Sequence, residues 1–383
     1  MRIRIKLAFL SHICRMCAQI AHRAHNLLND ILLVKGVTMK RSIIVILSCL
    51  LLISINLYAG DLEPTAAPGP TMKTLDRVEP RIPITQNDIP LTIGSSGSYY
   101  LTQNVTSSTT AITVAADDVT IDLMGYTITG SEVAGTYGVY MNRRKNVEIR
   151  NGTVQKFYTG ILEASSSSSE HRIINIRSEG NVNSGIHLSG YCNIVKDCTV
   201  TENGLEATAS AYGIYAYYSS RVEGNVVCSN GRSAGGYFYG IYAPYGCIVK
   251  DNIVNNNGYM ATAINYGIYA YSGGTVTGNS VFDNGDYTDG NFYGIYTNFV
   301  GTISGNSVNT NGSHAEGDVY GIRAGGGAVV KGNTVNSNGY DAANSFGIYL
   351  SSYCMADQNS SYNNYGTNMY VGTGCSLGTN VAP

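Results

Sequence analysis

The chain has 383 residues, a formal net charge of −2, and only 13% Asp, Glu, Lys and Arg. Such a low content of basic residues, with no dense Lys/Arg cluster, excludes a nucleic-acid partner, which requires a basic stripe or patch. The composition also disfavours a helical fold, because 45 glycines and 30 tyrosines occur among many Asn, Ser, Thr and Val residues, which favour strands and turns.

The first segment, residues 1–38, has no clear role in a fold. It contains a single Cys-x-x-Cys pair, Cys14 and Cys17, with three histidines close to it in the sequence. A zinc site would need two such pairs at a defined separation. We therefore interpret residues 1–38 as an extension outside the structure, or as sequence that precedes a true start at Met39.

Residues 39–59 have the layout of a secretory signal peptide. Two basic residues precede an apolar run from Ile43 to Leu57, and Ala59 offers a small residue for cleavage. An uncleaved membrane anchor is the alternative, but about 15 apolar residues fall short of the ~20 that a spanning helix needs. We expect an exported protein that starts near Gly60, is secreted, cell-surface or periplasmic, and has no membrane span in its mature form.

Residues 60–90 are rich in proline and are expected to form a linker and an N-terminal cap, whereas residues 91–383 are dominated by one repeat. A glycine followed by Ile or Val recurs at steps of 22 to 28 residues, most often 27. Self-similarity at such a period indicates an array of stacked units. The repeated glycines are Gly138, Gly160, Gly185, Gly213, Gly240, Gly267, Gly294, Gly321 and Gly347.

Aligning the repeats on these glycines gives three aliphatic columns per repeat. One repeat shows all three, with Ile241 directly after the glycine, Val249 about nine residues after it, and Val254 in the third column. Three short strands separated by Gly, Asn and Ser turns cannot bury an apolar face alone, but they can if each coil stacks on the next. The pattern predicts an all-β solenoid with three sheets and about 27 residues per coil.

Two asparagine columns mark the turns, one between the second and third strands and one after the third strand. Asparagine tolerates the left-handed backbone of a sharp bend, and stacked amides can hydrogen-bond along the stack. We interpret both columns as structural ladders rather than glycosylation or metal sites. The first is Asn225, Asn252, Asn279, Asn306, Asn333 and Asn359, with Cys198 one coil earlier; the second is Asn203, Asn230, Asn257, Asn284, Asn311, Asn338 and Asn364.

The cysteines after residue 60 are expected to be buried free thiols. Export permits disulfides, but Cys192, Cys247 and Cys354 each stand seven residues after their glycines, on coils that are not adjacent. Two coils of about 4.8 Å each separate residues by nearly 10 Å, whereas a disulfide needs Cα atoms within about 7 Å. The six cysteines are Cys192, Cys198, Cys228, Cys247, Cys354 and Cys375.

The Gly-Ile-Tyr strand, the turn asparagine and the period of about 27 residues resemble the right-handed parallel β-helix repeats of the pectate-lyase-like superfamily. Residues 112–130 resemble the first coil of exported members, and residues 71–84 resemble the short cap that often precedes it. The resemblance covers roughly residues 71–375 and implies a right-handed parallel β-helix. It does not imply one activity, because lyases, hydrolases, epimerases and adhesins share this fold.

The resemblance also implies that a substrate would lie along the outer face of the first sheet, in the column two residues after each glycine. This column carries tyrosines and one arginine but no carboxylate, so neither a calcium-dependent lyase site nor a two-carboxylate glycosidase site can be assigned to it. Its single histidine, His187, has no expected partner in register. We predict no catalytic residue and a substrate-binding row of Tyr215, Tyr242, Tyr269, Tyr296, Arg323 and Tyr349.

Carboxylates occur instead in the loops after the Asn-Gly turns. Asp289 and Glu316 both stand five residues before their glycines and should be neighbours on adjacent coils. They are solvated loop acids or, with Asp286 nearby, the ligands of a calcium ion. We predict no metal site and no cofactor, with calcium as the alternative.

Two classes of function fit these features. The first is an exported, monomeric module that binds an extended acidic or neutral polysaccharide along the tyrosine row, used as a platform for sugar rings, without cleaving it. Arg323 supports it, because a planar guanidinium suits a uronate carboxylate; the structural alternative is that the rings only pack and protect the sheet. The second class is a polysaccharide-acting enzyme, a lyase, hydrolase or epimerase, whose catalytic groups come from the loops.

Overall fold

The computed structural model describes residues 19, 22–23, 26, 80–205 and 207–383. The predicted signal peptide (39–59) and nearly all of residues 1–38 lie outside the described residues. Residues 80–383 belong to one compact unit, Thr74–Pro383. Among the described residues, no helix is long and apolar enough to cross a membrane.

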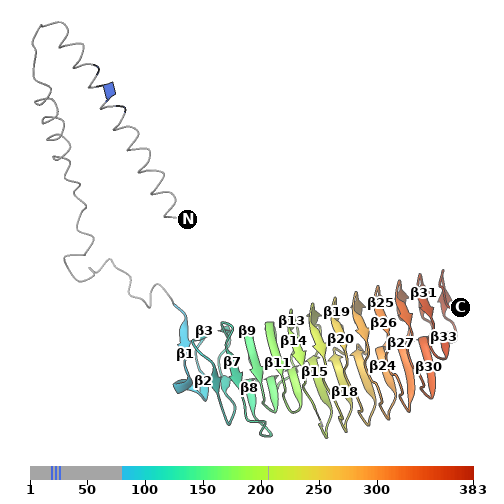
Figure 1. The fold of residues 1–383 in the computed structure, drawn as a ribbon, viewed down its shortest axis with the longest axis horizontal. Helices are drawn as coiled ribbons and strands as arrows, with labels where there is room; N and C mark the ends of the chain where they lie inside the picture. The colour runs from blue at the N-terminus through green and yellow to red at the C-terminus, as the bar shows by residue number, and fades with distance from the viewer. Residues whose placement is uncertain (1–18, 20–21, 24–25, 27–79, 206) are drawn as a thin grey trace, which may run out of the picture. The chain divides into compact units, whose positions relative to one another are not determined.

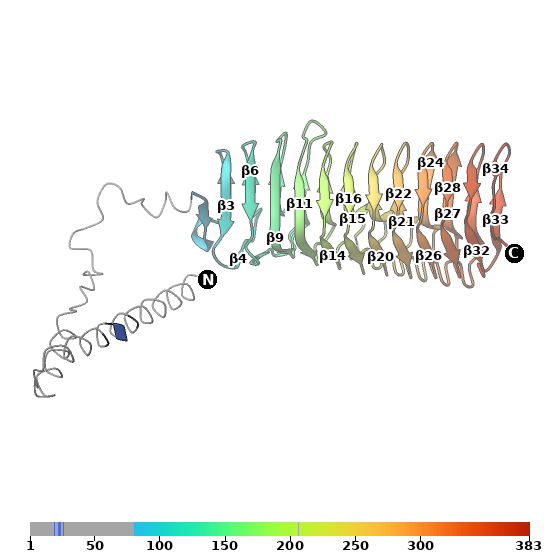
Figure 2. The same ribbon diagram turned by 90° about the horizontal axis from the view of Figure 1, so that it is seen from above.

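Most coils of this unit contain three short strands, as two successive coils show. Strands β15 (Ala211–Ala216), β16 (Arg221–Glu223) and β17 (Val226–Cys228) are followed by β18 (Phe238–Tyr242), β19 (Ile248–Lys250) and β20 (Ile253–Asn255). Equivalent strands of the two coils pair in parallel. Figures 1 and 2 show the coils stacked side by side, from β1 near the N-terminal end of this unit to β33 and β34 at its C-terminal end.

The first strands of the coils form a 12-stranded parallel sheet. Besides β15 and β18, its members are β2 (Leu91–Ile93), β5 (Ile112–Val114), β8 (Tyr137–Met141), β10 (Thr159–Glu163), β12 (Ser184–Leu188), β21 (Asn265–Tyr269), β24 (Phe292–Phe299), β27 (Asp318–Gly326), β30 (Asn344–Leu350) and β33 (Thr367–Val371).

The second and third strands form two further columns, which β9 (Val147–Gln155) and β11 (Arg172–Glu179) join into one 22-stranded sheet because they run through the bend between them. The second-strand column also contains β1 (Ile82–Ile84), β3 (Gly97–Leu101), β6 (Val119–Asp122), β13 (Ile194–Lys196), β22 (Thr275–Thr277), β25 (Thr302–Ser304), β28 (Val329–Lys331), β31 (Met355–Asp357) and β34 (Ser376–Leu377). The third-strand column also contains β4 (Val105–Thr106), β7 (Thr127–Thr129), β14 (Thr199–Thr201), β23 (Ser280–Phe282), β26 (Ser307–Asn309), β29 (Thr334–Asn336) and β32 (Ser360–Tyr362).

The predicted all-β, three-strand coil is therefore confirmed. In residues 80–205 and 207–383 the one helical segment is the short 3-10 turn η1 (Gln86–Asp88). Strand β1 pairs with β3, so the ladder of coils already starts at Ile82, inside the segment 60–90 that was expected to be a linker and cap.

The core lies inside the coils and consists of the predicted aliphatic columns. Ile241, Val249 and Val254, one residue from each column, are fully buried. Each coil adds three or more such side chains, and burying a side chain of this kind is worth about 1.5–3 kcal/mol relative to exposing it. Because a single coil exposes both of its flanks, this burial is complete only when coils stack.

Both asparagine columns form the predicted ladders. The Nδ2 group of Asn279 donates to Oδ1 of Asn306 in the next coil and to the carbonyl oxygen of Val249 in the preceding coil, each at 3.0 Å. Its Oδ1 accepts the backbone N–H and the Nδ2 group of Asn252, each at 2.9 Å. The second column repeats this arrangement, as Asn257 and Asn284 show. The amides thus tie each coil to both of its neighbours.

All six described cysteines are free thiols, and Cys198, Cys247 and Cys354 are buried, as predicted. The prediction is wrong for Cys192, which is exposed. Its coil carries one extra residue before β13, so Asn193 rather than Cys192 stands in register with Ser220 and Cys247. Cys228 and Cys375 are half-buried. Cys375 is in register with Cys354, whose backbone N–H points to its Sγ at 3.4 Å.

Candidate functional site

The glycine of each Tyr-Gly-Ile-Tyr strand sets the direction of the tyrosines on the 12-stranded sheet. In β18, Gly240 and Ile241 are both buried, while Tyr239 and Tyr242 on either side of them are half-buried at the surface. A Cβ atom on Gly240 would lie 2.6 Å from the carbonyl oxygen of Gly267 in the next coil, so only glycine fits this inward position. Two consecutive inward residues therefore bring both tyrosines to the same outer face.

Two rows of rings cover this face. We call the residues before the glycines the first tyrosine row and those after the Gly-Ile pairs the second tyrosine row; together they form the aromatic face. The first row is Tyr212, Tyr239, Tyr266, Tyr293 and Tyr320, and the second is Tyr215, Tyr242, Tyr269 and Tyr296, continued by Arg323 and Tyr349. The second row is the predicted site, which the structure places in register; the first row was missed.

The rings of each row stack on one another along the solenoid. Tyr239 and Tyr266 have ring centroids 4.9 Å apart at an interplanar angle of 2°, and Tyr242 and Tyr269 have centroids 4.9 Å apart at 7°. Within one coil the rows meet edge to face, as Tyr239 and Tyr242 do at 4.9 Å and 78°. Interior rings are covered by parallel neighbours on both sides. They offer ring edges and phenol groups, not the open faces that a platform for sugar rings would need.

Most phenol hydroxyls of the aromatic face have no partner among the described residues; the exception is Tyr320, which donates to Asp318 at 3.4 Å. None of the hydroxyls from Tyr212 to Tyr296 in the two rows makes a hydrogen bond within the part of the chain that the structure describes. None of them is enclosed either, because none is among the buried polar atoms without a partner. Each coil from β15 to β24 therefore presents two hydroxyl groups that only solvent or a ligand can satisfy.

The hydroxyls of Tyr239, Tyr242 and Tyr269 stay protonated at neutral pH. Burial among the neighbouring rings, together with repulsion between adjacent tyrosinates, raises the pKa of Tyr242 to about 12. The same causes raise the pKa of Tyr239 and Tyr269 further above the ordinary value. The rows are therefore hydrogen-bond donors and acceptors, and at neutral pH they supply no tyrosinate that could act as a base.

Arg323 interrupts the second tyrosine row and is held by aromatic rings. Its guanidinium carbon lies 5.4 Å from the ring centroid of Tyr296, 5.6 Å from that of Tyr320, and 5.7 Å from those of Tyr293 and Tyr349. The side chain is half-buried and makes no hydrogen bond or ion pair within the described residues. Cation–π contacts stabilise the charge, and its planar fork remains available to an anion.

His187 lies at the opposite end of the second row. It stands in the same column as the tyrosines, and β12 and β15 pair it with Tyr215. The two rings stack with centroids 4.1 Å apart at 5°, and Tyr212 meets the imidazole edge-on at 5.5 Å. Burial lowers the pKa of His187 to about 4, so the imidazole is neutral at pH 7.

The loop carboxylates do not form one constellation. Asp286 pairs with Nδ1 of His314 at 3.3 Å. Asp289 and Glu316 are exposed on adjacent coils, as expected, and their carboxylates have no partner among the described residues. Across residues 80–205 and 207–383, no three His, Cys, Asp or Glu side chains lie close enough together to hold a metal ion.

Comparisons with known proteins agree with this architecture. A family model for the right-handed beta helix region matches residues 93–246. The A-module of the mannuronan C-5 epimerase AlgE6 from Azotobacter vinelandii has a TM-score of 0.52 at 14% identity, over 79% of this chain and 89% of that chain. The catalytic domain of Agl-KA has a TM-score of 0.50 at 14% identity, over 78% of this chain and 62% of that chain. No curated protein matches the sequence. At such identities the likeness shows the fold alone.

Proposed function

We propose that this right-handed parallel β-helix repeat protein binds an extended acidic polysaccharide along its aromatic face and does not cleave it. The main support for this proposal is Arg323. Its half-buried guanidinium lies among four tyrosine rings and has no acidic partner among the described residues. A guanidinium pairs with a carboxylate through two parallel hydrogen bonds. Partial burial strengthens that attraction relative to a fully hydrated surface, and a uronic acid polymer carries one carboxylate per sugar.

The tyrosine rows supply contacts along the same line. The coils from β15 to β24 present unpaired hydroxyls in both rows, and neighbouring coils repeat about every 4.8 Å. Equally spaced donors and acceptors suit a polymer with repeating hydroxyl and carboxylate groups better than a compact ligand. Arg323 then provides the one charge-assisted contact, and the hydroxyls provide many weaker ones.

The aromatic face lacks the groups that cleavage requires. Hydrolysis of a glycosidic bond uses two carboxyl groups on either side of it, and neither tyrosine row contains one. Proton abstraction needs a base with a pKa near the working pH. Burial raises the pKa values of Tyr239, Tyr242 and Tyr269 well above that range, and the pKa of His187, about 4, is well below it.

A polysaccharide-acting enzyme is the second candidate. The fold is shared with an enzyme module whose name states that it acts on mannuronan, and fold likeness does not separate the two candidates. In this chain the catalytic groups would have to come from the loops, where Asp286 pairs with His314 and where Asp289 is exposed. The layout of residues 39–59 supports export, so either activity would be exerted outside the cytoplasm.

Titration of polygalacturonate and alginate into the native protein and the Arg323→Gln variant tests the proposal. We expect binding that weakens with salt, and a loss of about tenfold or more in the variant, because a hydrogen bond to a charged group contributes about 1.5–3 kcal/mol. Arg221→Gln is the matched control, since Arg221 lies on the 22-stranded sheet and pairs with Glu223. Equal affinity in native and Arg323→Gln protein would refute the proposal. New chain ends that disappear on Asp289→Asn would identify the enzyme instead.

A further inference from the structure

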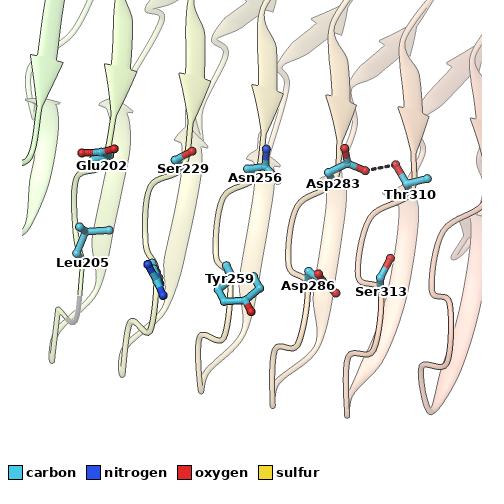
Figure 3. Close-up of a pocket in the computed structure, with 10 residues that line it drawn as sticks. Glu202, Leu205, Ser229, Asn256, Tyr259, Asp283, Asp286, Thr310 and Ser313 are labelled. Carbon is cyan, nitrogen blue, oxygen red and sulfur yellow. Dashed lines mark hydrogen bonds between the residues drawn. The ribbon is translucent and has the colours of Figure 1, made fainter.

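A groove lies at the turns that follow the third strand in five successive coils. Figure 3 shows two parallel rows of side chains, with one residue of each row contributed by each coil. The first row runs from Glu202 to Thr310, directly before the second asparagine column, and the second runs from Leu205 to Ser313, two residues after that column. Between them is a groove of about 640 Å³, which we call the turn groove.

Backbone geometry explains why this groove is lined by free side chains. The residue before each ladder asparagine has a left-handed backbone conformation, as at Asn256 and Asp283, both with φ 52°. The glycine after the asparagine has a positive φ as well. The two bends turn the asparagine inward, where its amide forms the hydrogen bonds of the ladder. The side chains on either side of it are left outside, so their chemistry is not dictated by packing.

One exposed ring, that of Tyr259, lines the turn groove. The guanidinium carbon of Arg232 lies 5.8 Å from the ring centroid of Tyr259, and Tyr287 in the next coil meets Tyr259 edge to face at 6.0 Å and 74°. Tyr259 and Tyr287 are 36% and 48% exposed. Unlike the interior rings of the aromatic face, Tyr259 is not stacked on a parallel ring among the described residues. Because 36% of the residue is exposed, part of its ring surface stays open to a ligand beside Arg232 and Tyr287.

The polar lining of the turn groove is acidic, in contrast to the aromatic face. Its charged residues are Glu202, Asp283 and Asp286 against Arg232. Asp283 accepts a hydrogen bond from Thr310, and Asp286 contacts His314. Carboxylates accept hydrogen bonds from hydroxyl groups, and like charges repel a uronate. The lining therefore suits a chain that carries many hydroxyls and no negative charge.

We infer that the turn groove binds a neutral glycan chain parallel to the solenoid axis. The apolar face of a sugar ring packs on Tyr259, and its hydroxyls donate to carboxylates such as Asp283. This site is separate from the one in the proposed function, since it lies at the turns after the third strands and not on the 12-stranded sheet, and its acidic lining repels a uronate. One molecule could then hold an acidic polymer on the aromatic face and a neutral polymer in the turn groove.

Titration calorimetry with cellohexaose, laminarihexaose and mannohexaose tests this inference. We expect saturable binding of at least one of these probes to the native protein, a loss of about tenfold in Tyr259→Ala, because the sugar loses its aromatic contact, and a smaller loss in Asp283→Asn. Tyr259→Phe keeps the ring and should bind as the native protein does. Tyr353→Ala is the matched control, because Tyr353 is 71% exposed outside the groove.

The two sites are distinguished by measuring how each variant binds the ligand of the other site. Tyr259→Ala should leave polygalacturonate binding unchanged, and Arg323→Gln should leave binding of the neutral hexasaccharide unchanged. Melting temperatures confirm that each variant is folded. Two results would overturn the inference: no binding of any of the three neutral probes to the native protein, or neutral binding that survives Tyr259→Ala at full affinity. Neither result bears on Arg323.

Discussion

At the scale of single residues, the aromatic face depends on glycine. A Cβ on Gly240 would lie 2.6 Å from the carbonyl oxygen of Gly267 and 3.0 Å from Cγ1 of Val254. The nearer obstacle is backbone of the next coil, which cannot rotate away as a side chain can. Any larger residue must therefore push its strand outward, which exposes Ile241 and displaces the two tyrosines that flank the pair.

We expect Gly240→Ala to destabilise the protein by about 1–3 kcal/mol, the usual cost of overpacking a filled interior. The melting temperature and chemical denaturation followed by circular dichroism measure this. Gly235→Ala is the control, because Gly235 is exposed and the nearest atom to its added Cβ would be 3.7 Å away; its stability should stay within about 0.5 kcal/mol of the native value. Equal stability of the two variants would contradict the inward bend.

His171 makes the fold sensitive to acid. It is fully buried, and its Nδ1 accepts the backbone N–H of Val147 at 3.2 Å, while its Nε2 has no partner among the described residues. Burial lowers its pKa from 6.5 to about 4, despite the opposing influence of Asp117. Between these two values the unfolded chain binds a proton that the folded protein does not. Stability is therefore complete above pH 6.5 and is lost as the pH falls towards 4.

The variant His171→Asn should remove this contribution. Asparagine holds the equivalent place in the next coil, where Asn193 accepts the backbone N–H of His171. We expect the native protein to lose stability relative to the variant as the pH is lowered from 7 to 4, by about 1.4 kcal/mol for each unit that separates the folded and unfolded pKa values. Melting temperatures measured across this range test the effect. Parallel pH profiles for the two proteins would contradict it.

At the scale of elements, the asparagine ladders join the coils where the strands end. Asn279 bonds to the preceding coil through Val249 and Asn252 and to the next coil through Asn306, and it is 1% exposed. A buried polar group left without a partner costs about 1–3 kcal/mol. Each asparagine satisfies several such groups, so the ladder secures the turns as the aliphatic columns secure the strands.

Replacing Asn279 by leucine should cost at least about 1–3 kcal/mol, because the amide of Asn252 and the carbonyl oxygen of Val249 lose their partner. Asn309→Leu is a suitable control, since Asn309 is half-buried on the neighbouring strand β26 and its side chain makes, among the described residues, one hydrogen bond, which it accepts from Ser307. Thermal unfolding measures the stability of both variants. An unchanged melting temperature for Asn279→Leu would show that the internal ladder does not contribute to stability.

The strands and ladders could be predicted because each depends on a one-dimensional pattern. The columns of Ile241, Val249 and Val254 recur at one period, and the inward turns require asparagine at the same period. The first tyrosine row was missed because strict alternation would place Tyr239 and Tyr242 on opposite faces, and the two inward residues between them break that rule. Cys192 was misplaced for a related reason, since one extra residue shifts the register of its coil.

The turn groove could not be predicted because its lining changes from coil to coil. Glu202, Asn256 and Asp283 occupy equivalent positions but share no residue type. Only the stacking of coils brings them into one row beside Tyr259. The contact of Asp286 with His314 likewise joins adjacent coils and is not revealed by the period alone.

At the scale of the whole molecule, stacking of the coils places the same residues of each repeat in long rows on the surface. The aromatic face and the turn groove both run along the coils, and their binding groups recur once per coil. A polymer with its own repeat can make the same weak contact many times, so total affinity grows with the number of coils engaged. The aromatic face carries the single cation Arg323, whereas acids outnumber bases in the turn groove.

The most direct test of the account is a titration of polygalacturonate into the native protein and into a Tyr242→Phe, Tyr269→Phe double variant. Phenylalanine keeps the stacked rings but removes two hydroxyls that have no partner in the described structure. Each hydrogen bond to a ligand contributes about 0.5–1.5 kcal/mol. The account predicts that affinity falls by about tenfold while the melting temperature is unchanged. A double variant that binds polygalacturonate as tightly as the native protein would contradict it.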